Sequence, residues 1–257
     1  MIAIKSRAGD GQMAALDFGD AARPVDLVFV HANGFNAMTY RGVLGPLALG
    51  LRVLAVDYRL APEHRFPAGL EDVLAAYRWG RDNAARFGAP AGTAAIGGDS
   101  MGGNFAAVIA QELRRAGEAQ PALQLLIYPA VDVASETQSM TTYADAYPLS
   151  RATMDWFMGH YMPTDASPTD VRLSPIKETD LSGLAPAVVV TAGFDPLVDQ
   201  GEAYAKRLRD AGAPVAYRCY DSLAHGFTAF TGAVPCADVA CREIAGLVRE
   251  GLAGRLR

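Results

Sequence analysis

The chain has 257 residues, of which 51% are hydrophobic and 20% are charged, and its formal net charge is −5. This length suits one large α/β domain, so we expect residues 1–257 to form a single domain. The acidic balance argues against a nucleic-acid binder, which would carry a basic patch.

Cysteine content and hydropathy indicate the cellular compartment and the absence of a membrane span. The three cysteines, Cys219, Cys236 and Cys241, have no disulfide-framework spacing and no accompanying zinc-ligand pattern. We therefore expect buried or partly buried free thiols and no metal site. Residues 1–10 lack the apolar run of a signal peptide, and no stretch is long and apolar enough to span a membrane. These features predict a cytoplasmic protein without a membrane span.

Short β-rich runs alternate with helical segments along the chain. Two weak strands near residues 2–6 and 13–18 are expected to form a hairpin. Apolar runs suited to buried strands follow at 26–30, 52–56, 93–96, 123–128 and 187–191, and residues 215–220 alternate like a sheet-edge strand. Helices are expected at 70–87, 102–117, 201–212 and 239–256. The alternation predicts an α/β fold with a mainly parallel, twisted sheet flanked by helices.

Residues 133–182 break this rhythm and are expected to form a small cap inserted over the sheet. The segment is rich in proline and in aromatic residues, namely Tyr143, Tyr147, Trp156, Phe157 and Tyr161. An insertion at the strand ends lies where α/β sheets place their binding sites. The aromatic side chains could line an acyl pocket or simply pack the cap onto the sheet, and the sequence leaves both open.

The strongest local motif is Gly98-Asp99-Ser100-Met101-Gly102, followed by Gly103. It matches G-x-S-x-G, the nucleophile elbow of the α/β-hydrolase fold, in which a sharp turn joins a strand to a helix. An apolar strand precedes the motif and an amphipathic helix follows it, as the elbow requires. A side chain at position 98 or 102 would collide with neighbouring backbone, so glycine is needed there. Ser100 is the predicted nucleophile.

A serine nucleophile needs a general base, which in this fold follows the serine and an acidic residue in the chain. The sequence has four histidines, and only His160 and His225 follow Ser100. His160 lies within a predicted cap helix at 154–162, where a surface or packing role is expected. His225 follows the last predicted strand, so it is the predicted base.

The acid should lie on a loop between Ser100 and His225. Asp195 directly follows the strand predicted at 187–191, which precedes the strand that carries His225. It is the predicted acid, and its role would be to hold the imidazole in the correct tautomer. Asp132 also follows a strand and is the alternative. Asp199 is expected to cap the next helix.

Together, these motifs resemble the hormone-sensitive-lipase family of bacterial esterases and lipases, within the α/β-hydrolase superfamily. The resemblance runs from about Leu54 to the C-terminus, and its carriers are Asp57–Pro67, Gly98–Gly103, Tyr128-Pro129, Asp195–Asp199 and His225–Phe227. It implies carboxylic ester hydrolysis, usually of short acyl chains, by a Ser-His-Asp triad without a cofactor. It also makes a homodimer plausible, to which the edge-like strand at 215–220 could contribute.

The N-terminal segment, about residues 1–56, looks more like other α/β hydrolases. The family normally has His-Gly-Gly-Gly after the strand ending at Val30, whereas this chain has His31-Ala32-Asn33-Gly34. The oxyanion of a tetrahedral intermediate needs backbone N–H donors. We expect these from Met101, which follows the nucleophile, and from Asn33 and Gly34. The altered loop predicts a changed donor count or a narrower alcohol pocket.

The sequence therefore predicts a carboxylesterase that acts on a small-molecule ester. Two rival functions stay open. The same triad could serve an amidase, a lactonase or an acylaminoacyl peptidase, because triad chemistry does not separate esters from amides. Alternatively, the fold could be a catalytically weak ligand-binding member, which the altered His31–Gly34 loop would favour.

Overall fold

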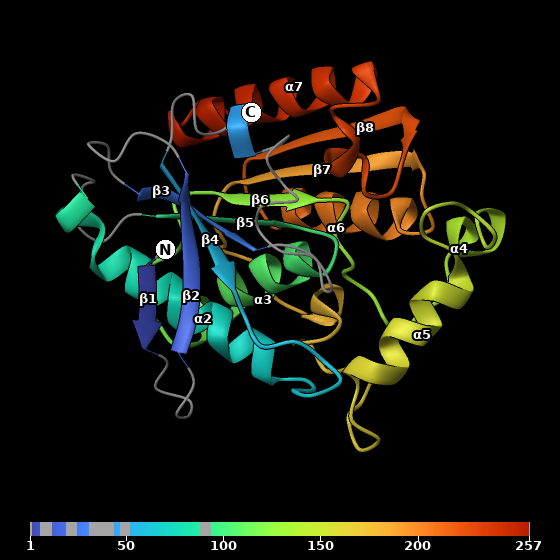
Figure 1. Cartoon of the computed structure of the whole chain (residues 1–257), viewed down its shortest axis with the longest axis horizontal. Helices are drawn as coiled ribbons and strands as arrows, with labels where there is room; N and C mark the ends of the chain where they lie inside the picture. Colours follow the sequence, from blue (N-terminus) through green and yellow to red (C-terminus); the bar gives the residue numbers. More distant parts are fainter. Residues whose placement is uncertain are drawn as a thin grey trace.

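A computed structural model describes residues 2–5, 12–18, 25–30, 44–46, 52–87 and 94–256, and it contains an eight-stranded sheet (Figure 1). The strands are β1 (Ile2–Lys5), β2 (Gln12–Phe18), β3 (Val25–Val30), β4 (Arg52–Asp57), β5 (Ala95–Asp99), β6 (Gln124–Ile127), β7 (Ala187–Phe194) and β8 (Val215–Ala224). Their order across the sheet is β1-β2-β4-β3-β5-β6-β7-β8.

From β4 through β3, β5, β6 and β7 to β8, each strand pairs in parallel with the next one across the sheet. β1 and β2 form an antiparallel hairpin, and β2 pairs antiparallel with β4. Ile96 pairs with Val28 on one side and with Gln124 on the other. The predicted fold class and the N-terminal hairpin are therefore confirmed. Within the described sheet β8 is the last strand, as the edge pattern predicts, while dimer formation stays a prediction.

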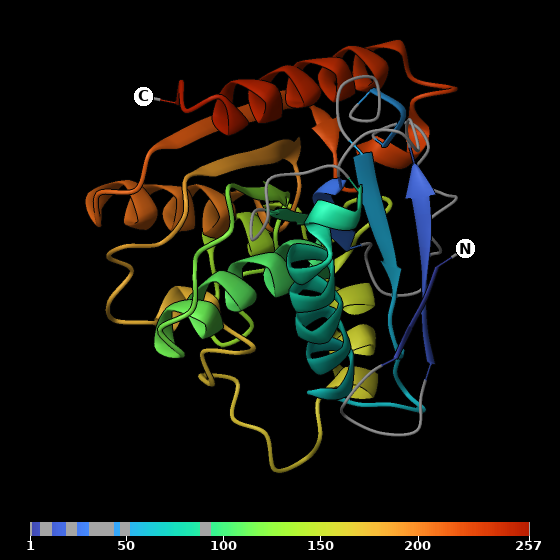
Figure 2. The ribbon, with the colours of Figure 1, turned by 90° about the vertical axis from the view of Figure 1, so that its left-hand side faces the viewer.

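Helices cover the two faces of the sheet unequally (Figures 1 and 2). The α-helices are α2 (Ala68–Asp82), α3 (Met101–Arg115), α4 (Gln138–Thr142), α5 (Arg151–Tyr161), α6 (Val198–Asp210) and α7 (Pro235–Leu252). Short 3₁₀ helices are η2 (Ala84–Phe87), η3 (Pro175–Lys177) and η4 (Phe227–Phe230). In both views α7, drawn in red, lies on the opposite side of the sheet from α2 and α3.

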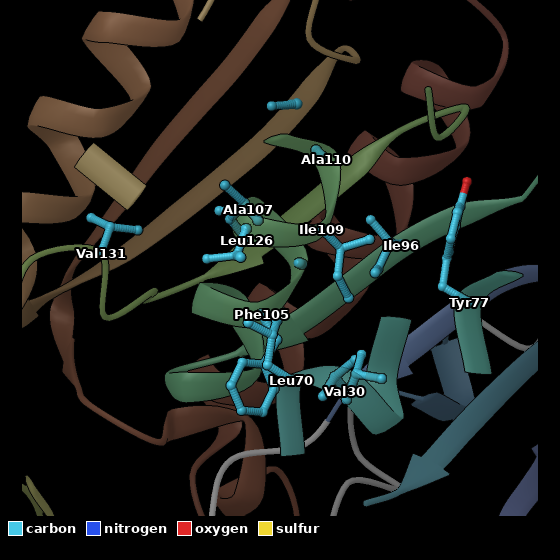
Figure 3. Close-up of a cluster of buried hydrophobic side chains, with 14 of the residues drawn as sticks. Val30, Leu70, Tyr77, Ile96, Phe105, Ala107, Ile109, Ala110, Leu126 and Val131 are labelled. Atoms are coloured by element: carbon cyan, nitrogen blue, oxygen red, sulfur yellow. The ribbon is translucent and has the colours of Figure 1, made fainter. Parts of the chain in front are cut away.

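Alternation along the strands produces two hydrophobic layers. Val28, Ile96, Leu126 and Val189 share one layer with apolar residues of α2, α3 and α6. Figure 3 shows Ile96 and Leu126 in this layer together with Phe105 and Ile109 of α3. Their sequence neighbours on the strands point the other way and share a layer with α7. A sheet buried on both faces explains why the strands read as continuous apolar runs.

Several predicted boundaries differ from the structure: the helices predicted at 201–212 and 239–256, for example, begin at Val198 and Pro235. Two of the differences have clear local reasons. The helix predicted at 70–87 ends at Asp82, and the amide of Asn83 donates to the carbonyl of Trp79 at 2.9 Å, a side-chain bond that competes with helix continuation. The strand predicted at 93–96 extends instead to Asp99, because Gly97 and Gly98 pair with both neighbouring strands. Glycine weakens strand patterns in sequences, so this extension was missed.

Residues 133–182 contain α4, α5 and η3, and in Figure 1 α4 and α5 lie beyond the ends of β6 and β7. Helix α5 begins earlier than predicted because the Ser150 hydroxyl accepts a hydrogen bond from the backbone N–H of Thr153 at 3.1 Å. Among the aromatic residues of this segment, Tyr161 is buried, whereas Tyr147 and Trp156 are 86% and 61% exposed. Tyr161 therefore serves packing.

All three cysteines are free, and Cys241 and Cys219 are buried and partly buried as predicted, whereas the prediction is wrong for Cys236, which is exposed near the start of α7. Burial raises the pKa of the Cys241 thiol to about 12, which keeps it protonated and unreactive. Among the described residues, no helix is both long and apolar enough to cross a membrane.

Candidate active site

Ser100 lies in the sharp turn between β5 and α3. Its φ of 54° and ψ of −117° are rare for a residue with a side chain, and such strain concentrates at functional sites. Backbone bonds hold the turn on both sides. The N–H of Ser100 donates to the carbonyl of Ile127 at 2.8 Å, and its carbonyl accepts from the N–H of Ala130 at 3.2 Å. The nucleophile predicted from G-x-S-x-G thus sits on a strained, fixed turn.

The glycines around Ser100 allow the turn to close. A Cβ atom at Gly98 would lie 2.4 Å from the backbone of Gly102 and 2.5 Å from the carbonyl oxygen of Val30. A Cβ atom at Gly103 would lie 2.9 Å from Pro129. The collision predicted at position 98 is therefore present, and the atoms that it involves belong to the backbone of Gly102 and Val30. Asp99, the remaining elbow residue, is buried at 2% exposure.

The structure brings the three predicted triad residues together. The Nδ1 atom of His225 lies 2.7 Å from Asp195 Oδ2, and its Nε2 atom lies 3.0 Å from Ser100 Oγ. Ser100, Asp195 and His225 follow the carboxyl ends of β5, β7 and β8, which run parallel across the sheet. In this arrangement the imidazole can accept the hydroxyl proton while the carboxylate stabilises the resulting imidazolium.

Burial and backbone contacts fix the carboxylate of Asp195. Asp195 has no exposed surface, and its second carboxylate oxygen, Oδ1, accepts the N–H of Leu197 at 2.8 Å. His225 is 8% exposed. Because Oδ1 is bonded to a backbone N–H, Oδ2 is the oxygen that bonds the imidazole, and this favours a single orientation of the ring.

The rival residues occupy other contacts. Asp132, the alternative acid, accepts the N–H groups of Ala134 and Ser135 and lies 3.2 Å from Lys177 Nζ. His160 packs its ring against Trp156 on α5, with centroids 4.5 Å apart, which agrees with the packing role expected for it.

The role expected of Asp199 is wrong. Its carboxylate does not cap α6, which begins at Val198, but accepts the N–H of Ser139 at 2.7 Å. The Ser139 hydroxyl donates to the carbonyl of Pro196, also at 2.7 Å. These bonds tie α4 to the loop that follows Asp195. The position of Asp199 is ambiguous in the sequence, because an acidic residue in the first turn of a helix often stabilises the N-terminus of that same helix.

The oxyanion-hole prediction is only partly within the described chain. Met101 is the first residue of α3, so its N–H belongs to the helix-start amides that have no acceptor within the helix. These groups and the helix dipole favour an anion at this point. Asn33 and Gly34, the other predicted donors, lie outside the described residues.

Two contacts around His225 were not predicted. The ring of Tyr128 packs against the imidazole with centroids 4.6 Å apart, and its hydroxyl makes a short hydrogen bond with Thr228. The sequence identifies Tyr128 only as part of a family motif. Nothing around a tyrosine at the end of a strand indicates which distant residues its side chain will contact.

The buried hydroxyl of Tyr58, a residue that packs against α3, stays protonated. Burial raises the pKa of Tyr58 well above its usual value, and Tyr161 and Asp99 nearby raise it further. Tyr58 packs edge-on against Phe105 of α3.

Among the described residues no cluster of His, Cys, Asp or Glu side chains could hold a metal ion.

Comparisons with known proteins agree with this geometry. A family model described as "alpha/beta hydrolase fold" matches residues 27–229, so the match begins earlier than the motifs near Leu54. Carboxylic ester hydrolase LipN of Mycobacterium tuberculosis is 44% identical over 220 residues, which cover 81% of this chain and 58% of LipN. Carboxylesterase NlhH of the same species is 40% identical, with 87% of this chain and 73% of NlhH covered.

An esterase structure from Pyrobaculum calidifontis superposes with a TM-score of 0.91 at 36% identity, and covers all of this chain and 85% of the other. The match to LipN covers 58% of that protein, so this chain spans a little over half of its length. The matched region includes the strained Ser100 turn, Asp195 and His225. The chain therefore belongs to the α/β-hydrolase family, in agreement with its resemblance to the hormone-sensitive-lipase group.

Proposed function

We propose that this chain is a serine carboxylesterase that hydrolyses short-chain acyl esters through an acyl-enzyme. The observation that carries the proposal is the continuous chain of contacts Asp195–His225–Ser100, with distances of 2.7 and 3.0 Å, on a strained turn that begins a helix. The names of the relatives, carboxylic ester hydrolase and carboxylesterase, support an ester as substrate.

In the first half of the cycle, Ser100 Oγ attacks the ester carbonyl carbon while His225 Nε2 takes the hydroxyl proton. The carbonyl oxygen becomes an oxyanion, which the N–H of Met101 at the start of α3 would bind, and Asn33 and Gly34 remain the other donors predicted from the sequence. Each such donor lowers the barrier by roughly 3–4 kcal/mol. His225 then gives its proton to the leaving alcohol, and the acyl group stays on Ser100.

In the second half, water replaces the alcohol. His225 takes a proton from the water as it attacks the acyl-enzyme, and returns it to Ser100 Oγ when the acid leaves. Asp195 keeps its charge throughout, because its task is to orient the imidazole and stabilise the imidazolium. Within the protein, only Ser100 and His225 change protonation state during the cycle.

The first test compares hydrolysis of p-nitrophenyl butyrate by the wild type and by Ser100→Ala. We expect turnover by the wild type and none above background by the variant, because the attacking oxygen is absent. A folded wild type without turnover would refute the esterase and favour a ligand-binding role. Folding is monitored by circular dichroism of both proteins.

The acyl preference is tested with the p-nitrophenyl esters of acetate, butyrate, octanoate and laurate. We expect kcat/KM to be highest for the short esters. A laurate optimum would contradict the short-chain assignment without affecting the triad. An amide such as a p-nitroanilide of butyrate serves as the control for the rival amidase, and we expect it to react far more slowly than the ester.

A further inference from the structure

Beyond the triad, one aromatic side chain contacts the loop that carries the proposed base at two points. Tyr128 packs its ring on the imidazole of His225, with centroids 4.6 Å apart and the planes inclined by 54°. Its hydroxyl forms a short hydrogen bond with the hydroxyl of Thr228, three residues further along. Phe227, between them, meets the Tyr128 ring edge-on at 5.3 Å. Tyr128 therefore contacts the base itself and two of the three residues that follow it.

The backbone around Tyr128 also holds the nucleophile. The residue before it, Ile127, accepts the N–H of Ser100 at 2.8 Å, and Ala130 donates to the Ser100 carbonyl at 3.2 Å. The N–H of Tyr128 itself donates to Val190 of β7 at 2.6 Å. The segment from Ile127 to Ala130 thus contacts the Ser100 turn through its backbone and the His225 loop through one side chain.

Tyr128 adopts an unfavourable conformation in order to make these contacts. Its φ of 34° lies in the left-handed region, which large side chains avoid, and its side chain is 1% exposed. Among the described non-glycine residues, Ser100 and Tyr128 have positive φ, and both belong to this network. Strain of this kind persists where the surrounding structure enforces it, often because the site needs the resulting geometry.

We propose that Tyr128 is a positioning residue that sets the imidazole of His225 relative to Ser100 Oγ. The ring limits the tilt of the imidazole, and the bond from its hydroxyl to Thr228 keeps the turn of η4 from drifting away from the strand ends. The inference rests on the proposed esterase function. It assigns to Tyr128 and Thr228 a role in the rate of proton transfer, with no contact to substrate.

The proposal predicts a split between rate and binding. Losing the hydroxyl in Tyr128→Phe keeps the ring but frees the loop, so the base samples orientations in which Nε2 no longer faces Ser100 Oγ. Small misplacements of a catalytic group cost roughly tenfold to hundredfold in rate. We therefore expect kcat to fall by roughly this factor while KM for p-nitrophenyl butyrate stays unchanged.

Partner and rescue variants test whether the hydroxyl pair is responsible. Thr228→Val removes the other hydroxyl at nearly constant size and should lower kcat as much as Tyr128→Phe does. The double variant should be no slower than either single variant, because both break one bond. Thr228→Ser keeps a hydroxyl and should retain wild-type kcat.

Tyr77→Phe is the matched control. Tyr77 is a fully buried tyrosine on α2 whose hydroxyl donates to the carbonyl of Ala94 at 3.2 Å. Ala94 directly precedes β5, at the opposite end of that strand from Ser100. Deleting this hydroxyl should lower the melting temperature without changing kcat. If Tyr77→Phe loses as much kcat as Tyr128→Phe, or Tyr128→Phe keeps wild-type kcat, the positioning role is overturned.

The outcomes separate this inference from the proposed function. Each variant is assayed beside the wild type and Ser100→Ala, and labelling of Ser100 by a fluorophosphonate is timed as a second measure of nucleophile activation. Slow labelling of Tyr128→Phe alongside an active wild type supports the positioning role. Normal labelling alongside an active wild type refutes it and leaves the esterase intact. An inactive wild type refutes both.

Discussion

The nucleophile turn and helix α5 each contain glycines, but the space around these glycines differs. At Gly98 an added Cβ atom would overlap the backbone of Gly102 and Val30, whereas at Gly159 of α5 nothing lies within 4 Å. In the turn, backbone atoms pack so closely around Gly98 that no side chain fits. On α5, Gly159 faces open space. The same residue type is therefore a requirement in one region and a weakness in the other.

The polar groups of the two regions differ in the same way. Asp195 is fully buried and both of its oxygens are bonded within the site. On α5, Arg151 pairs with Glu136 and Asp155 at the surface. Exposed pairs contribute little to stability, while a buried pair that loses one partner costs much more. Substitutions should therefore have large effects near Ser100 and small ones on the cap.

Among the substitutions that compare these two regions, the largest effect is expected from Asp195→Asn. The amide can present its NH₂ group to His225 Nδ1 and so impose the tautomer that cannot accept the proton of Ser100. We expect kcat to fall by about 10⁴-fold with the fold retained. Stopped-flow or extended-time hydrolysis of p-nitrophenyl butyrate gives the number.

Asp132→Asn is the matched control for the acid. Asp132 is the other candidate from the sequence, and its carboxylate contacts Lys177 and two backbone N–H groups. It should keep wild-type kcat per folded molecule even if stability falls. A collapse of kcat in Asp132→Asn, with Asp195→Asn still active, would move the acid to Asp132.

The second effect contrasts the two glycines directly. Gly98→Ala forces the turn apart and should cost about 1–3 kcal/mol of unfolding free energy, together with most of the activity. Gly159→Ala should gain about 0.5–1 kcal/mol, because alanine has the higher helix propensity and open space around it. Urea unfolding and ester hydrolysis measure both. Equal effects of the two substitutions would remove the distinction between the regions.

The elbow and the positions of the strands along the chain could be predicted from the sequence because both depend on local signals. The apolar run before Ser100 and the glycines beside it are constrained by contacts between near neighbours, so the motif carries the geometry with it. The choice of Asp195 over Asp132 also followed from chain order. The structure places Asp195 against His225, across 30 residues of chain.

Long-range polar contacts could not be predicted. Nothing in the sequence around Ser139 indicates that its N–H meets Asp199, 60 residues away, and Tyr128 bonds Thr228 across 100 residues. The register between distant loops depends on the packing of the whole sheet, which a local pattern does not encode. The last three residues of β5 also could not be predicted, because its glycines do not fit the apolar pattern of a buried strand.

The third effect concerns the tie between the cap and the acid loop. Ser139→Ala removes the hydroxyl that donates to Pro196, a bond worth about 1 kcal/mol, and should lower the melting temperature by about 2–4 °C. The loop after Asp195 becomes less restrained, so we expect a modest fall in kcat, far smaller than that of Asp195→Asn. Thermal unfolding and hydrolysis rates are compared. An unchanged melting temperature would show that the cap is held by other contacts.

The control for this tie is Ser167→Ala in the same segment. The Ser167 hydroxyl contacts only local neighbours, Thr169 among them, on the exposed surface. It should leave both the melting temperature and kcat unchanged. Equal losses in the two variants would attribute the effect to the segment as a whole and not to the contact with the acid loop.

The smallest effect is expected far from both regions, at Glu118. Arg81 and Arg78 of α2 donate to this carboxylate and hold its pKa below the usual value. A depressed pKa in the folded state means that the carboxylate stabilises the fold above the ordinary glutamate pKa, and that this stability is lost as pH falls through the folded pKa. Because the group is near the surface, we expect only about 0.5–1 kcal/mol at neutral pH.

Glu118→Gln makes this measurable. The difference in unfolding free energy between wild type and variant should be present at pH 7, shrink below about pH 4, and fall at high salt, which screens surface pairs. Activity should not change, because the pair joins α2 to the end of α3 away from Ser100. A difference that persists at low pH would assign the stabilisation to packing of the Glu118 side chain, whereas a loss of kcat would mean that the α2–α3 contact reaches the nucleophile turn through α3.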